Sequence, residues 1–109
     1  MKKSAPLEKD IQFAICKYLE YKKIFFWRQN TNPIMNKKTG SFRAMPKYSM
    51  NGVPDIILII DGAFVGLEVK RPKIGVQSAD QKTFEKKCKK AGGLYYIVTS
   101  LDDVLKLGI

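Results

Sequence analysis

Three ionisable residues, Asp55, Glu68 and Lys70, are spaced so that a β-hairpin would bring them together. Asp55 opens an apolar run at 55–60, and Glu68 and Lys70 lie near the end of a second run at 63–70. An Asp-Gly dipeptide, typical of two-residue hairpin turns, separates the two runs. Because side chains alternate along a strand, Glu68 and Lys70 share one face, and the hairpin returns Glu68 to the neighbourhood of Asp55. The spacing therefore predicts that two carboxylates and one ammonium converge.

This group of side chains suits the hydrolysis of phosphodiester bonds. Converging carboxylates repel one another, and they are stable together when a hard cation such as Mg²⁺ or Mn²⁺ binds between them. The metal would lower the pKa of a bound water and neutralise charge in the transition state, and Lys70 would orient the water or stabilise the developing anion. Val69 offers its main-chain carbonyl as a further metal ligand.

Other kinds of chemistry are excluded by the residues that the chain lacks. It has no His, which excludes nucleases with His-bound metals and hydrolases with a Ser-His pair. Cys16 and Cys88 have no second Cys nearby to form a zinc knuckle or a redox pair, so we expect reduced cysteines in the core. Carboxylates or Lys must therefore carry out any chemistry, and we expect no small-molecule cofactor.

Size and charge indicate one small domain with a polyanionic partner. The chain has 109 residues, of which 45% are hydrophobic, and its formal net charge is +10. Nucleic acid is the first candidate partner and an acidic membrane surface the second. The first residues are charged and no apolar run is long enough to span a bilayer, so we expect a cytoplasmic protein with no membrane partner.

The pattern of apolar residues predicts the element order αβββαβα. This order gives an α/β fold, with a mixed central sheet flanked by helices, in a single domain spanning residues 1–109. A long polar stretch at 30–52 follows the first strand. The first predicted elements are a helix at 4–22, with Ser4 as N-cap and Pro6 in its first turn, and a strand from 24 to about 29. The hairpin at 55–70 follows. The last three are a helix at 78–91 with Ser78 as N-cap, a strand at 94–99, and a short helix capped by Ser100.

The hairpin residues resemble a known nuclease signature. Pro54 and Asp55, followed by Glu68, Val69 and Lys70, look like the PD-(D/E)-x-K motif on its characteristic hairpin. With Glu8 in the first helix, Gly52 before the motif and Gln81 in the next helix, the chain resembles the VRR-NUC (virus-type replication-repair nuclease) domain over nearly its whole length. The resemblance implies metal binding by Asp55 and Glu68, catalysis by Lys70, a further acidic site residue at Glu8, and support of the site by Gln81.

The same resemblance implies a function. It implies a restriction-endonuclease-like core that cleaves DNA with Mg²⁺ or Mn²⁺ and selects its substrate by DNA structure. Small stand-alone members of this family are associated with homodimers that cut four-way (Holliday) junctions, as in phages and bacteria, and recombination or repair would suit such an enzyme. Two alternatives stay open: a nuclease for flaps or other simpler substrates, and a basic nucleic-acid-binding module whose acidic residues are structural.

Ordinary structural roles are available for several of these residues. Gln81 lies three residues after Ser78, which is the spacing of a capping box. Glu8 lies in a first helical turn, where the negative charge of an acidic residue interacts favourably with the helix dipole. Spacing alone does not separate these roles from functional ones.

Basic residues near the site are candidates for contacts with DNA phosphates. After Gly75, Val76 and Gln77 stand where the resemblance leads us to expect a basic residue, which weakens the case for a DNA contact there. The aromatic residues at 25–27 are interpreted as core because they lie within an apolar strand. The candidate DNA contacts are Arg28, Arg43, Lys47, Arg71 and Lys73.

Overall fold

The computed structural model describes residues 6–29 and 47–109, and the element order αβββαβα is confirmed. The Ser4 position and the Arg43 candidate contact lie outside the described residues. The elements are α1 (Glu8–Tyr21), β1 (Phe25–Arg28), β2 (Ile56–Ile60), β3 (Ala63–Val69), α2 (Ala79–Lys90), β4 (Leu94–Val98) and α3 (Leu101–Lys106).

The four strands form one mixed sheet in the order β1-β2-β3-β4. The predicted hairpin is present: β2 and β3 are antiparallel, and Ile57 lies opposite Gly66. Asp61 and Gly62 form its turn with positive φ angles of 50° and 81°. β1 adds to β2 in antiparallel fashion, and β4 pairs with β3 in parallel after the crossover through α2.

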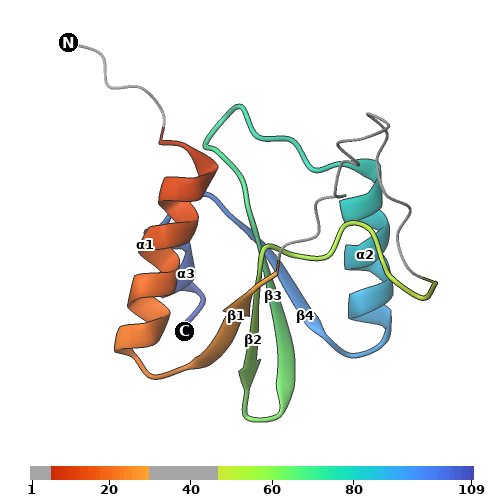
Figure 1. Cartoon of the computed structure of the whole chain (residues 1–109), viewed down its shortest axis with the longest axis horizontal. Helices are drawn as coiled ribbons and strands as arrows, with labels where there is room; N and C mark the ends of the chain where they lie inside the picture. The colour runs from red at the N-terminus through yellow and green to blue at the C-terminus, as the bar shows by residue number, and fades with distance from the viewer. Residues whose placement is uncertain (1–5, 30–46) are drawn as a thin grey trace, which may run out of the picture.

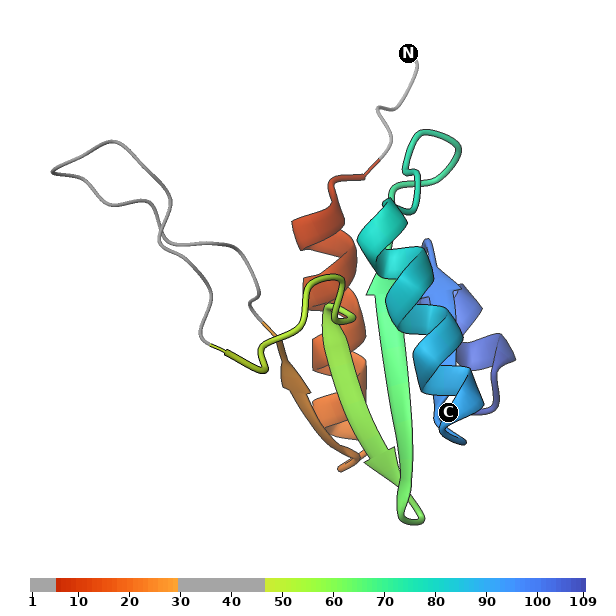
Figure 2. The ribbon, with the colours of Figure 1, turned by 90° about the vertical axis from the view of Figure 1, so that its right-hand side faces the viewer.

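Helices lie on both sides of the sheet (Figure 1). α1 and α3 lie on one side and α2 lies on the other. The core is on the α1 side, where Ile15 and Leu19 of α1 pack against Leu58, Leu67 and Val98 of the sheet. α2 has no fully buried residue, and it lies over β3 and β4 (Figure 2). Within residues 6–29 and 47–109, no helix therefore lies over the α2 side of β1 and β2.

Helix termini agree with the sequence except at the start of α1. Ser78 caps α2 in a full capping box, and Ser100 caps α3 through the backbone N–H of Asp103. α1 instead begins at Glu8 with Leu7 at its N-cap position and no side-chain cap, so Pro6 precedes the helix. The predicted cap at Ser4 was therefore wrong, and the acidic residues of the first turn are what favour the dipole there.

The aromatic strand β1 is less buried than its composition suggested. Phe26 packs against the core, but Phe25 and Trp27 are 68% and 38% exposed. The interpretation of these two residues as core was wrong: they alternate with Phe26 along β1, so they point away from the core on the α1 side. Both cysteines are free and half-buried, and burial raises the pKa of each thiol.

None of the helices in the described ranges combines the length and the apolar character needed to cross a bilayer.

Candidate active site

The candidate site residues meet at the end of the sheet where β3 ends and where α1 and α2 begin (Figures 1 and 2). Two contacts define this meeting point. The Arg71 side chain, just after β3, donates from Nε to the Pro6 carbonyl at 3.1 Å, which holds the start of α1. The Gln81 side chain, in the first turn of α2, donates from Nε2 to Glu68 Oε1 at 2.7 Å.

Glu68 and Asp55 form a carboxylate pair within this end of the sheet. Glu68 is 1% exposed, and the backbone N–H of Val69 donates to Asp55 Oδ2 at 2.8 Å. This bond fixes the Asp55 carboxylate beside the end of β3. In the part of the chain that the structure describes, Glu68 Oε2 is the buried side-chain oxygen that accepts no hydrogen bond, so an ionised Glu68 has one unpaired oxygen. Only a protonated carboxyl could donate a hydrogen bond to Asp55. An unpaired buried acceptor is costly, so its retention points to a ligand or a proton at this atom.

The environment of Glu68 strongly disfavours its ionised form. Burial, the Asp55 charge and a hydrogen bond with Asp55 raise the pKa of Glu68 to about 9, against the opposing effect of Lys70. The Glu8 carboxylate makes a smaller contribution in the same direction as Asp55. The predicted convergence of carboxylates is thus present, and both Asp55 and Glu8 make Glu68 harder to ionise.

Lys70 approaches the carboxylate pair as the hairpin predicted. Its Nζ lies 3.8 Å from Glu68 Oε1, and its side chain is 13% exposed. The backbone N–H of Lys70 donates to Val98 of β4 at 3.0 Å. A Cβ on Gly75 would lie 2.8 Å from the Cβ of Lys70, so the glycine lets the following loop pack closely against this side chain.

Gln81 performs both of the roles that its position allowed. Its Oε1 accepts from the backbone N–H of Ser78 at 2.8 Å, which completes the capping box of α2. Its Nε2 donates to Glu68, which holds one oxygen of the buried carboxyl in place. One amide group therefore both caps α2 and orients the Glu68 carboxyl.

Two glycines position the Asp55 segment, and their contacts were not evident from the sequence. Gly52 has a φ of 77°, and a Cβ there would lie 2.3 Å from the carbonyl oxygen of Asp80. The loop before Asp55 can therefore touch the first turn of α2 only with glycine at this position. Gly66 leaves room for Pro54, whose Cγ would lie 2.5 Å from an added Cβ. Only the Gly-x-Pro-Asp pattern itself hinted at these contacts.

A divalent cation fits this donor set in part. Glu68 Oε2 is free, and carboxylate oxygens are the ligands that Mg²⁺ and Mn²⁺ prefer. Within residues 6–29 and 47–109, no three His, Cys, Asp or Glu residues cluster closely enough to form a complete metal centre. Mg²⁺ commonly uses one or two carboxylates with waters and substrate phosphates, so two carboxylates are sufficient.

The candidate DNA-binding residues are not all on one face. Arg28 is exposed on the α1 side of the sheet, where its charge opposes the rise that burial causes in the pKa of Cys16. Lys47 places its Nζ 5.1 Å from the ring centre of Tyr48. Lys73 is exposed, with a φ of 65°. Arg71, as described above, holds the start of α1.

Gln77, which stands where a basic residue was expected, has a structural role. Its side-chain amide donates to Glu85 Oε1 at 3.0 Å and to the Tyr95 hydroxyl at 3.4 Å. These bonds connect the loop before α2 to the helix and to β4.

The similarity of the chain to known proteins is structural. No family model and no curated protein matches it. One solved structure, described as "VRR_NUC domain", matches with a TM-score of 0.65 at 20% identity, covering 92% of this chain and 91% of the other. A second, described as "VRR_NUC domain protein", matches with a TM-score of 0.61 at 17% identity, covering 98% and 87%. The chain therefore has the fold of VRR_NUC domains, an α/β fold whose mixed sheet is flanked by helices, as the sequence resemblance implied.

Proposed function

We propose that this protein is a nuclease that hydrolyses DNA phosphodiester bonds with the help of a divalent cation. The observation that carries the proposal is the buried Glu68 carboxyl, whose Oε2 accepts no hydrogen bond and which lies beside Asp55. A carboxylate kept for stability alone would have its oxygens paired. The fold that this chain shares with VRR_NUC domains supports the same proposal.

Asp55 and Glu68 are the residues that would hold the cation. Val69 offers its main-chain carbonyl, and Glu8 adds negative charge from the start of α1. When bound, Mg²⁺ or Mn²⁺ supplies an activated water and neutralises charge on the phosphate. The chain's own part is to keep the carboxylates oriented: the Val69 N–H holds Asp55, and Gln81 holds Glu68.

Lys70 is the proposed catalytic residue that acts on the water and the phosphate. Its ammonium lies within reach of Glu68 Oε1 and is largely shielded from solvent. In this position Lys70 can orient the attacking water and offset the negative charge that develops on the phosphate oxygens. Shielding strengthens such an effect, because charges interact more strongly where water is excluded.

The proposed substrate is DNA, in keeping with the net charge of +10. Lys47, Lys73 and Arg71, together with Arg28 and Arg43, are the proposed phosphate contacts. From the resemblance we further propose that the whole chain, residues 1–109, acts as one nuclease domain on branched DNA, as a homodimer that cuts four-way junctions. A monomer mass in solution at the concentration of the assay would contradict the homodimer.

Cleavage of a matched set of DNAs tests the proposed function. Four-way junction, flap, duplex and single-stranded DNAs are incubated with Mg²⁺, Mn²⁺ or EDTA, and wild type is compared with Lys70→Met. We expect metal-dependent cleavage that falls by roughly 10²- to 10³-fold in the variant, with DNA binding largely retained. Lys89→Ala, which removes an exposed lysine of α2 paired with Glu85, is the control and should cleave normally. Binding without cleavage under every metal would instead favour the non-catalytic alternative.

A further inference from the structure

The α2 side of the sheet carries aromatic and apolar residues that the proposed chemistry does not use. In the register of the strands, Phe25 lies opposite Ile59, and Ile59 lies opposite Phe64, so these three form one row across the sheet. The next row begins with Trp27 and Ile57. We call Phe25, Trp27, Ile59 and Phe64 the aromatic face.

The aromatic face lies near the candidate active site, and Pro54, packed over Gly66, lies between the two. Gly66 continues the row of Trp27 and Ile57, and Glu68 lies two residues further along β3 on the same side. Two residues along a strand span about 7 Å and two strand spacings about 10 Å, so Trp27 and Glu68 are roughly 12 Å apart. At 3.4 Å per stacked nucleotide, this distance corresponds to a few nucleotides.

The rings of this face are available to a ligand. α2 lies over β3 and β4, and none of the helices in the described part of the chain lies over this side of β1 (Figure 2). Phe25 and Trp27 are 68% and 38% exposed, with their ring centres 5.8 Å apart. The indole N–H of Trp27 donates to Gln29 Oε1 at 2.9 Å, which orients the larger ring. Contiguous exposed apolar residues are typical of interaction sites, and these two rings adjoin one another.

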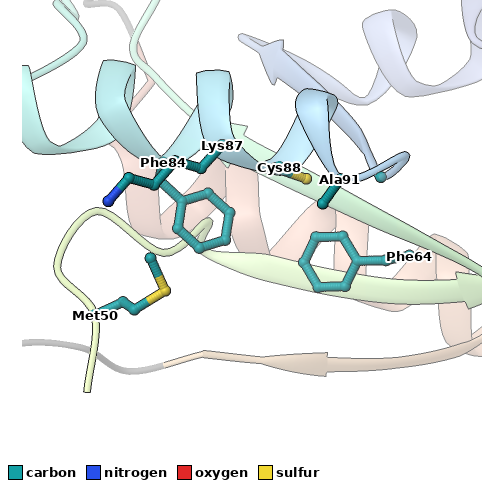
Figure 3. A pocket seen from close by; sticks show the side chains of 7 residues that line it. Met50, Phe64, Phe84, Lys87, Cys88 and Ala91 are labelled. Carbon is teal, nitrogen blue, oxygen red and sulfur yellow. The ribbon is translucent and has the colours of Figure 1, made fainter. Parts of the chain in front are cut away.

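The face continues into a groove beside α2. Met50, Phe64 and Phe84 point into this groove, and Lys87 and Cys88 lie along its helical wall (Figure 3). The groove has a volume of about 320 Å³ and is lined mainly by apolar atoms. Phe64 belongs to both the face and the groove, so the two form one continuous surface.

Charge decides which kind of partner fits. The chain carries a net charge of +10, so its surface attracts a polyanion. Lys87 lines the groove. Lys47, three residues before Met50 in the sequence, lies beside the exposed ring of Tyr48. Aromatic rings flanked by basic side chains are the features by which proteins bind single-stranded nucleic acids, because every base can stack on a ring.

We propose that the aromatic face binds unpaired bases of single-stranded DNA, with stacking on Trp27 and Phe25, and directs the strand toward Glu68. As a route to the cleavage site the proposal rests on the proposed nuclease function. As a binding surface it stands without that function, and it is tested without cleavage.

Trp27 is the single tryptophan of the chain, so its fluorescence reports on this surface alone. An oligothymidylate of 12 nucleotides is titrated into the protein in EDTA, and a duplex of the same length is titrated in parallel. We expect the single strand to quench Trp27 fluorescence strongly and the duplex to leave it nearly unchanged at the same saturation. Quenching by both to the same extent, or by neither, would overturn the proposal.

Substitutions measured by anisotropy of a labelled oligothymidylate separate stacking from general charge attraction. Trp27→Ala and Phe25→Ala should each weaken binding by about 5- to 150-fold, as loss of base stacking does. Trp27→Phe should recover most of the loss and shows that the fold is intact. Phe13→Ala is the matched control, since Phe13 is 61% exposed but belongs to α1 on the other side of the sheet.

The remaining outcomes each have one meaning. Unchanged affinity in Trp27→Ala would refute the stacking surface. A molecular mass in solution that doubles with concentration in wild type but not in Trp27→Ala would assign the face to a second copy and overturn the proposal. Single-strand binding that depends on Trp27, in a protein that cuts no DNA with any metal, would uphold the surface and contradict the nuclease.

Discussion

Replacing Glu68 by Gln should stabilise the metal-free protein at alkaline pH while abolishing cleavage. The amide keeps an oxygen to accept from Gln81, and its NH₂ group can donate to Asp55, as the protonated carboxyl does. The variant therefore resembles the protonated form of Glu68 at every pH. It loses the negative charge that a cation requires.

The expected magnitude follows from the pKa of Glu68. Burial, as the largest cause, and Asp55 raise the pKa of this group from 4.5 to about 9. Lys70 opposes the rise, and Glu8 adds to it slightly. Between these two values the folded protein binds one more proton than the unfolded chain, so its free energy of unfolding falls as the pH rises. The slope is at most about 1.4 kcal/mol per pH unit, which gives a loss of about 1–3 kcal/mol from pH 6 to pH 8.

Denaturation in urea with EDTA, followed by the fluorescence of Trp27, measures this difference. Wild type should lose stability from pH 6 to pH 8, whereas Glu68→Gln should not, so the stability of the variant relative to wild type should increase by about 1–3 kcal/mol between these pH values. Glu85→Gln is the control: Lys89 and Gln77 lower the pKa of Glu85, so its contribution is lost only at acidic pH and the wild-type slope should persist. Mg²⁺ at ten times its dissociation constant should stabilise wild type by about 1.4 kcal/mol and leave Glu68→Gln unchanged.

One result would refute this reasoning. If wild type keeps its stability up to pH 8 and Glu68→Gln is less stable, then Glu68 is ionised in the metal-free protein and stabilised by Lys70. Glu68 would then be part of a structural ion pair, and its free oxygen would not be a sign of a ligand.

Two further pairs of variants test the way in which the site is positioned. Gly52→Ala should lower the free energy of unfolding by about 3 kcal/mol and slow cleavage, because φ is strained and the new Cβ meets the backbone of α2. Gly62 has a similar φ but open space around it, so Gly62→Ala should lower the free energy of unfolding by only about 1 kcal/mol and leave cleavage unchanged. Urea denaturation and a cleavage assay measure both effects. Ser78→Ala should cost about 1 kcal/mol as a lost helix cap, with normal cleavage. Gln81→Ala should lower the free energy of unfolding by about 1 kcal/mol more than Ser78→Ala does, and it should slow cleavage at least about tenfold, since Glu68 loses its hydrogen bond. Equal cleavage in Ser78→Ala and Gln81→Ala would mean that Gln81 serves only as a cap.

The sequence predicted most of the fold because strong local signals agreed with one another. The Asp-Gly turn fixed the hairpin, and the serines at 78 and 100 marked two helix starts. The start of α1 was wrong because no side chain caps it and a Ser and a Pro stand nearby. Such a start depends on tertiary contacts, here the bond from Arg71 to the Pro6 carbonyl, which no local pattern reveals.

The candidate site was predicted in its residues but not in its supporting contacts. Strand alternation was sufficient to bring Asp55, Glu68 and Lys70 together. The contact of Gly52 with α2 joins segments far apart in the sequence, so it could not be read from composition. The exposure of Trp27 was missed for a similar reason, because an apolar strand does not show which of its faces a helix will cover.

The arrangement of α1 and α2 also affects the electrostatics of the site. Both helices begin at the end of the sheet where β3 ends (Figure 1). The N-terminus of a helix carries a partial positive charge of about half an elementary charge, and this charge comes from backbone dipoles that do not titrate. Two such ends therefore offset part of the repulsion among the crowded carboxylates without the need for additional lysines. A designer who transferred only the hairpin to another scaffold would leave this contribution behind.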